Sequence, residues 1–266
     1  MKVIIFNDTQ NFNGSLSFIN YYLSKKAKRF WDYKKYIPFL VERIKKEDCL
    51  NNSDLQLVKT YFYEGKYNSN LISSIVWACN EKIRGINALI DWEKNLLNII
   101  SQDKLSHVLR RKINSHVEAI KKELEEKKQY YFHYIAKQKR NFEGQKKLFE
   151  KLRGNAFVEL KPTILKQREG EIYQKGVDVL LATDLVHLAH TNAYDVAIIL
   201  SGDTDLVEAV KLVKSLGKTV VIISYHTPRI PKLSNISDLM NHGKFINLKD
   251  FTKEEIEQMS ELREDK

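Results

Sequence analysis

Short segments near both ends of the chain have the pattern of strands. They are 2–7, 55–63, 156–160, 195–200 and 218–224, with a short last one at 244–248, and some of them, such as 2–7, are continuous apolar runs. Such runs are typical of parallel strands, which are buried on both faces. Segments of helical periodicity lie between them, at roughly 15–47, 178–190 and 205–216. This alternation predicts an α/β fold, a parallel sheet with helices on both faces.

The middle of the chain has a different pattern. Residues 70–151 contain no proline, and their apolar positions recur every three or four residues. This spacing predicts two or three long amphipathic helices, arranged as a hairpin or a small bundle. We therefore expect a discontinuous α/β domain over 1–69 and 152–250, a long helical insertion over 70–151, and a charged C-terminal tail over 251–266. After the insertion, Lys161-Pro162 is expected to end the strand predicted at 156–160.

The positive charge is concentrated in the predicted insertion. The chain has a net charge of +10, and residues 70–153 contribute +8 of it. An excess of this kind indicates an acidic partner, most commonly nucleic acid, although a lysine-rich surface is often only solvated. No stretch approaches the ~18 apolar residues of a membrane span, and the two cysteines have no metal-binding spacing. We expect a cytoplasmic protein without a membrane partner.

Aspartates directly follow two of the predicted strands. Asp8 ends the first strand, and Ser201-Gly202-Asp203-Thr204-Asp205 follows the strand that ends at Leu200. Binding sites of open parallel sheets form at the carboxyl ends of the strands. Carboxylates that meet there need a cation, and Mg²⁺ or Mn²⁺ favours oxygen ligands. Each aspartate alone is also explained as a turn former or a helix cap.

Several motifs in order resemble the NYN domain family, a group of PIN-like ribonucleases that includes LabA proteins. The motifs are Ile5-Phe6-Asn7-Asp8-Thr9-Gln10-Asn11, Lys175-Gly176-Val177-Asp178 with Asp184 on the same predicted helix, Ser201-Gly202-Asp203-Thr204-Asp205, Gly217-Lys218-Thr219-Val220-Val221 and Gly243-Lys244-Phe245-Ile246-Asn247-Leu248. The resemblance implies a PIN-like, Rossmann-like sheet and a Mg²⁺- or Mn²⁺-dependent endoribonuclease. It departs from the family at Thr9, where many relatives have glycine, at Glu208, and in the length of the insertion.

The resemblance also implies roles for individual residues. The catalytic, metal-binding pocket would consist of Asp8, Asp178, Asp203 and Asp205. The supporting or substrate-contacting residues would be Asn11, Asp184, Ser201 and Lys175. For Lys175 the alternative is an ordinary exposed lysine, and Asp184 would act through water or from outside the metal's immediate ligands.

The basic insertion has two interpretations. In one, it binds RNA phosphates and stacks unpaired bases on aromatic side chains, using Arg110, Arg111, Lys112, Lys137, Lys139 and Arg140 with Tyr130, Tyr131, Phe132 and Tyr134. In the other, the charges form a solvated face balanced by neighbouring glutamates, and the aromatic residues pack in a core. Homodimerisation through the insertion is compatible with both.

Two other functions compete with the metal-dependent nuclease. A haloacid-dehalogenase-like phosphatase would need Asp-x-Asp after the first strand, but Thr9-Gln10 follows Asp8. A catalytically silent RNA-binding or scaffold protein would use only the basic helices. The sequence leaves open the choice between RNA and DNA, any base preference, and the pathway served.

Overall fold

The computed structural model describes the chain except for residues 24–28, 51–53, 103–106, 169–170, 228–236 and 263–266. The described residues divide into two compact units. The first, here called the sheet unit, comprises Met1–Lys66, Phe149–Ile164 and Gln174–Lys266. The second, the hairpin unit, comprises Tyr67–Leu148 and Leu165–Tyr173. Each unit is described separately.

The sheet unit is built on a six-stranded sheet with the order β4-β3-β1-β7-β8-β9. All neighbouring strands run parallel. The strands are β1 (Lys2–Asp8), β3 (Gln56–Lys66), β4 (Val158–Ile164), β7 (Val196–Leu200), β8 (Thr219–Ser224) and β9 (Lys244–Asn247). The predicted α/β fold is confirmed, and the central pair β1 and β7 comes from segments far apart in the sequence.

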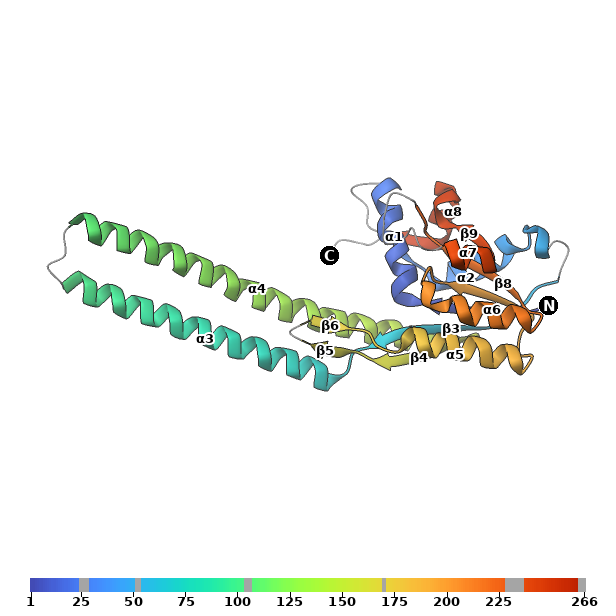
Figure 1. Cartoon of the computed structure of the whole chain (residues 1–266), viewed down its shortest axis with the longest axis horizontal. Coiled ribbons are helices and arrows are strands. Elements are labelled where there is room, and N and C mark those ends of the chain that lie inside the picture. Colours follow the sequence, from blue (N-terminus) through green and yellow to red (C-terminus); the bar gives the residue numbers. More distant parts are fainter. Residues whose placement is uncertain (24–28, 51–53, 103–106, 169–170, 228–236, 263–266) are drawn as a thin grey trace. The chain divides into compact units, whose positions relative to one another are not determined.

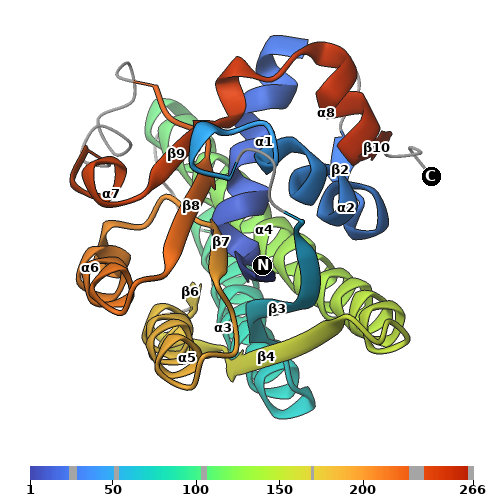
Figure 2. The same cartoon turned by 90° about the vertical axis from the view of Figure 1, so that its right-hand side faces the viewer.

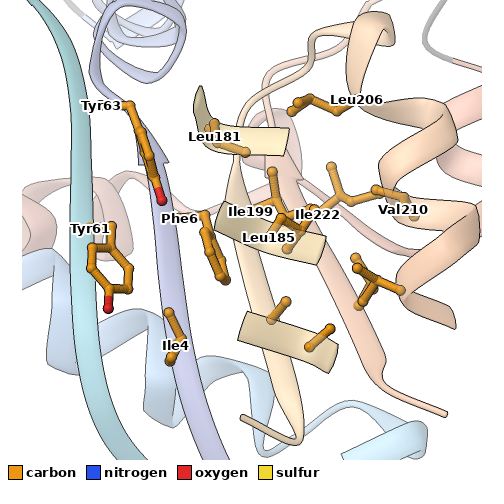
Figure 3. Close-up of a cluster of buried hydrophobic side chains, with 14 of the residues drawn as sticks. Ile4, Phe6, Tyr61, Tyr63, Leu181, Leu185, Ile199, Leu206, Val210 and Ile222 are labelled. Carbon is orange, nitrogen blue, oxygen red and sulfur yellow. The ribbon is translucent and has the colours of Figure 1, made fainter. Parts of the chain in front are cut away.

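Helices cover both faces of this sheet (Figure 2). One face packs against α5 (Val177–His190), α6 (Val207–Ser215) and α7 (Ser237–His242). Its buried side chains include Phe6, Leu185 and Ile199, which lie together in Figure 3. The other face is covered by α1 (Thr9–Leu23), α2 (Tyr33–Ile44) and α8 (Lys253–Met259). Alternate residues of each central strand therefore serve opposite cores, which explains the continuous apolar runs.

Several boundaries differ from the sequence-based expectations. The helix expected over 15–47 is in fact α1 and α2, separated by β2 (Arg29–Trp31), and residues 24–28 of that prediction lie outside the described part. Lys161-Pro162 does not end β4, because β4 is an edge strand where a missing N–H is tolerated. The residues expected to form a charged tail include α8 and β10 (Ser260–Leu262), and β10 pairs with β2.

The hairpin unit contains two long helices, α3 (Ser69–Gln102) and α4 (His107–Arg153, to Leu148 in this unit). They run side by side in Figure 1. A short antiparallel pair, β5 (Lys166–Arg168) and β6 (Glu171–Tyr173), belongs to the same unit and did not stand out in the sequence. Ile75 and Cys79 of α3 are buried in a small core that Tyr131 and Tyr134 of α4 join. None of the described helices has the length and hydrophobicity that a bilayer-spanning segment needs.

Candidate active site

Hydrogen bonds join the carboxyl ends of β1 and β7. The two strands pair in parallel, with Asn7 opposite Leu200, so the next residue of each chain segment also lies side by side. The Ser201 hydroxyl donates to Asp8 Oδ2 at 3.1 Å, across 193 residues of sequence. The same Ser201 oxygen accepts a hydrogen bond from the backbone N–H of Asp203 at 3.2 Å. One serine therefore links the two segments that carry the candidate aspartates.

Asn11, in the first turn of α1, supports the same junction. Its backbone N–H donates to Asp8 Oδ1 at 3.1 Å, and its side-chain Oδ1 accepts from the N–H of Gly202 at 3.0 Å. Both oxygens of the Asp8 carboxyl group thus have a protein donor, from Asn11 and from Ser201. The orientation of this buried carboxyl group is set by both neighbouring segments.

Two further aspartates approach from the adjacent elements. Asp178 lies in the first turn of α5, which begins after Gly176 at φ +83°, a left-handed conformation that glycine adopts readily. Asp205 lies in the 3-10 turn Thr204–Leu206, and its N–H donates to Asp203 Oδ1 at 3.0 Å. Asp203 thus also caps this turn. All four predicted pocket residues gather at one edge of the sheet, and they are called the acidic cluster below.

The electrostatics of the acidic cluster show an uncompensated negative charge. Burial, helped by the nearby carboxylates of Asp178 and Asp203, raises the pKa of Asp8 to about 6, although the hydrogen bonds from Asn11 and Ser201 act in the opposite direction. Burial also raises the pKa of Asp178, followed by the charges of Asp203 and Asp205. Like charges this close disfavour each other's ionised form. A cation bound among these carboxylates would lower both pKa values.

The donor set can be compared with what different cations require. Among the described residues, no three Asp, Glu, His or Cys side chains are arranged to hold one ion together. A closed protein cage, as for structural zinc, is therefore not formed by that part of the chain. Mg²⁺ usually keeps several waters and binds through one or two carboxylates together with substrate phosphates, and Mn²⁺ shares the preference for oxygen ligands. Mg²⁺ or Mn²⁺ fits the acidic cluster on these terms.

The structure places Asp184 in a different environment from the acidic cluster. Its Oδ2 accepts a hydrogen bond from the Tyr63 hydroxyl at 3.0 Å and lies 3.3 Å from Lys161 Nζ. Lys161 also lies 3.4 Å from Glu159, which pairs with Lys59 at 3.1 Å. These five residues on β3, β4 and α5 are called the edge network below. Burial lowers the pKa of Lys161, but Asp184 and Glu159 outweigh that effect and raise it overall.

Tyr63 and Lys161 were missed by the sequence reasoning. Tyr63 pairs with Asp8 on one side and with Lys161 on the other, so the three residues form one row across the sheet. One signal for Tyr63 was present in the sequence: alternation within the strand predicted at 55–63 puts Tyr61 and Tyr63 on the same face. Lys175, by contrast, is exposed, and Ser201 is buried at the junction.

The basic residues of α4 are mostly exposed. Lys127 and Lys128 form ion pairs with Glu123 and Glu125, which partly matches the solvated-face interpretation. The exposed candidates for RNA contact are Arg111, Lys112, Lys137, Lys139 and Arg140, whereas Arg110 is half-buried. The aromatic residues divide in the same way: Tyr131 and Tyr134 join the core, whereas Tyr130 and Phe132 are exposed.

A parallel α/β sheet with carboxylates gathered at the ends of its central strands defines the class of protein as PIN-like. The chain belongs to the NYN domain family, whose model matches residues 89–242. The match includes Asp178, Asp203 and Asp205 and begins after Asp8. Members of this family are generally nucleases or hydrolases. The resemblance seen in the sequence motifs is confirmed.

Two individual proteins are also similar to the chain. The uncharacterized protein y4oD of Sinorhizobium fredii is 38% identical over 60 residues, which span 23% of this chain and 28% of that protein. The chain thus aligns with less than a third of that relative's length. A crystal structure of a protein of unknown function from Vibrio parahaemolyticus aligns with 94% of this chain and 93% of its own, at 18% identity and a TM-score of 0.41.

Proposed function

We propose that the protein is a divalent-metal-dependent endoribonuclease whose active site is the acidic cluster. The observation that carries this proposal is the Asp8–Ser201–Asp203 hydrogen-bond chain, with Asp178 close enough to raise the pKa of Asp8. Such a group of carboxylates is destabilising without a cation, so its presence is better explained by function than by stability. Membership of the NYN family supports the same reaction class.

The residues would divide the work as follows. Asp8 and Asp203 would hold Mg²⁺ or Mn²⁺, with Asp178 and Asp205 completing the pocket directly or through water. The bound ion would supply an activated water and neutralise charge on the phosphate. Asn11 and Ser201 keep the Asp8 carboxyl group oriented through their hydrogen bonds. If Asp178 contacts the ion only through water, its carboxylate would be free to accept a proton from the attacking water.

A cleavage assay tests this proposal. Labelled single-stranded RNA is incubated with the protein and Mn²⁺, beside the Asp203→Asn variant and a DNA strand of the same sequence. Cleavage of RNA by the wild type but not by Asp203→Asn is the expected result. Glu208→Gln is the matched control, because Glu208 lies three residues beyond Asp205 and pairs only with the exposed Lys211 among the described residues. Equal binding of RNA by both proteins without cleavage would favour the silent RNA-binding alternative.

The exposed lysine and arginine side chains of α4 support a second part of the proposal, that the hairpin unit binds RNA phosphates. Lys137, Lys139 and Arg140 are exposed within one turn of helix, close to the exposed Phe132. Replacing all three by glutamine should weaken RNA binding and reduce the slope of log K against log salt by about 2. An unchanged slope would mean that these three residues do not contact RNA phosphates and form only a solvated face. Cleavage at saturating RNA should persist, which separates this test from that of the acidic cluster.

A further inference from the structure

Helix α3 carries a second apolar stripe besides the one that faces α4. Its core-facing stripe includes Ile75, Ile83 and Ile90, which are all buried. The second stripe consists of Leu89, Trp92, Leu96 and Ile99, at intervals of three, four and three residues. This is the spacing of a coiled-coil seam. A helix with two apolar stripes is typical of a bundle in which it contacts more than one neighbour.

Helix α4 carries a matching set on the same side of the hairpin. Leu109, Ile113, His116 and Ile120 follow one another at intervals of four, three and four residues. A surface groove runs between the helices there, lined by Trp92 and Leu96 from α3 and by Ile113, His116, Val117 and Ile120 from α4. The two sets, without the buried Val117, are called the outer seam below. In the described part of the hairpin, much of this seam is exposed to solvent although α3 packs against α4.

The apolar area that the outer seam exposes is close to what a stable protein interface needs. The exposed fractions are Leu89 52%, Trp92 61%, Ile99 65%, Leu109 45% and Ile120 37%. With ordinary side-chain areas they present roughly 400 Å² of apolar surface per chain. Since interfaces are about 57% non-polar, this corresponds to roughly 700 Å² buried per partner, near the ~800 Å² of a stable protein interface.

The charge of the groove favours a protein partner over RNA. Among the described residues that line it, those of fixed charge are Glu93 and Lys112, so this part of the groove has no excess of positive charge for phosphates. Glu93 is 7% exposed, and its Oε2 has no hydrogen-bond partner among the described residues. A buried carboxyl oxygen without a donor is costly. Lys112 or His116 from a second copy of the hairpin would provide a donor.

We propose that the outer seam is the interface between two copies of this chain, whose hairpins pack into a four-helix bundle. Both helices present apolar side chains at intervals of three and four residues, which a second copy of the same hairpin could match across a two-fold axis. The bundle would bury the exposed tryptophan and leucine side chains and give Glu93 its donor. The proposal does not depend on the nuclease activity.

Sedimentation equilibrium of the full chain tests the interface. The wild type is expected to have twice the mass of one chain at micromolar concentration. The double variant Trp92→Glu, Ile99→Glu should raise the dimer dissociation constant about 100-fold or more, because the two most exposed apolar side chains of the seam are replaced by charges. The matched control is Trp77→Glu, Val108→Glu, at positions that are 67% and 66% exposed and lie outside the outer seam. It should remain dimeric.

Three results would overturn the proposal. The first is a wild type that stays monomeric at high micromolar concentration. The second is an equal rise in the dimer dissociation constant for the control and the seam variant, which would mean that the chains associate through non-specific hydrophobic contacts. The third is a monomer whose tryptophan fluorescence is quenched by single-stranded RNA in the wild type but not in Trp92→Phe, which would make RNA the occupant. Circular dichroism establishes that the variants keep their helices, and the first result needs no variant.

Discussion

The acidic cluster and the edge network are two groups of charged residues on one sheet, and they are neutralised differently. Helix α5 contributes to both, with Asp178 in the first and Asp184 in the second. In the edge network, the charge of Lys161 neutralises Asp184, which also accepts a hydrogen bond from the Tyr63 hydroxyl. In the acidic cluster, the donors to Asp8 are a backbone N–H and a serine hydroxyl, which carry no full charge. The contrast supports the proposal that a cation binds at the acidic cluster and not at the edge network.

The largest expected difference between the two groups is in RNA cleavage. Asp203→Asn should reduce the cleavage rate by about 1,000-fold or more, because a lost metal ligand removes several kcal/mol of charge stabilisation. Asp184→Asn should reduce it by less than about 10-fold, because Asp184 acts on Lys161 and not on the cation. Single-turnover cleavage in Mn²⁺ measures both. Comparable losses would mean that the edge network is part of the active site.

The second expected difference is in the dependence of stability on pH without metal. Folded Asp8 has a pKa of about 6 and the unfolded residue about 3.9, so the folded state holds the extra proton between these values. Stability should therefore fall as pH rises from about 4 to 6, by up to about 3 kcal/mol, and stay lower above that range.

Asp8→Asn should remove this penalty, so it should be more stable than the wild type at pH 7.5 and about equal at pH 4. Urea unfolding in the presence of EDTA measures the difference. If the variant is the less stable protein at pH 7.5, the proposed charge strain at Asp8 is wrong.

The third expected difference is the response to a divalent cation. Mn²⁺ at about 100 times its dissociation constant should stabilise the wild type by about 2.7 kcal/mol, since it binds only the folded acidic cluster. Asp203→Asn should lose most of this gain, whereas Asp184→Asn should keep it. Thermal unfolding with and without Mn²⁺ provides the measurement. An equal gain for all three proteins would place the ion elsewhere.

The smallest expected effect comes from the edge network. Lys161→Met should cost about 1 kcal/mol, because the ion pair is partly exposed and Asp184 keeps its bond from Tyr63. The double variant Lys161→Met, Asp184→Asn should be no less stable than the single one, since no unpaired carboxylate remains. Urea unfolding of the wild type, the two single variants and the double variant completes the cycle. Additive losses would show that the two residues act independently.

Much of the sheet unit could be predicted from local pattern. The apolar runs of β1, β7 and β8 and the helical periodicity of α5 depend on short-range spacing, which sequence reports directly. Local pattern was misleading where tertiary contacts decide the result. Pro162 continues β4 only because that strand lies at the sheet edge, and β10 exists only because β2 is there to pair with it.

The sequence by itself determined which residues are candidates for binding a metal, because residue type and position after a strand are local properties. Tertiary structure alone decided which of them meet. Asp8 and Asp203 share a serine because β1 and β7 are neighbours, and Asp184 instead meets Lys161 because β3 lies between β1 and β4. The single helix α5 can supply Asp178 to the acidic cluster and Asp184 to the edge network, because the two residues are more than a turn apart. Strand order is a long-range property, so no window of sequence contains it.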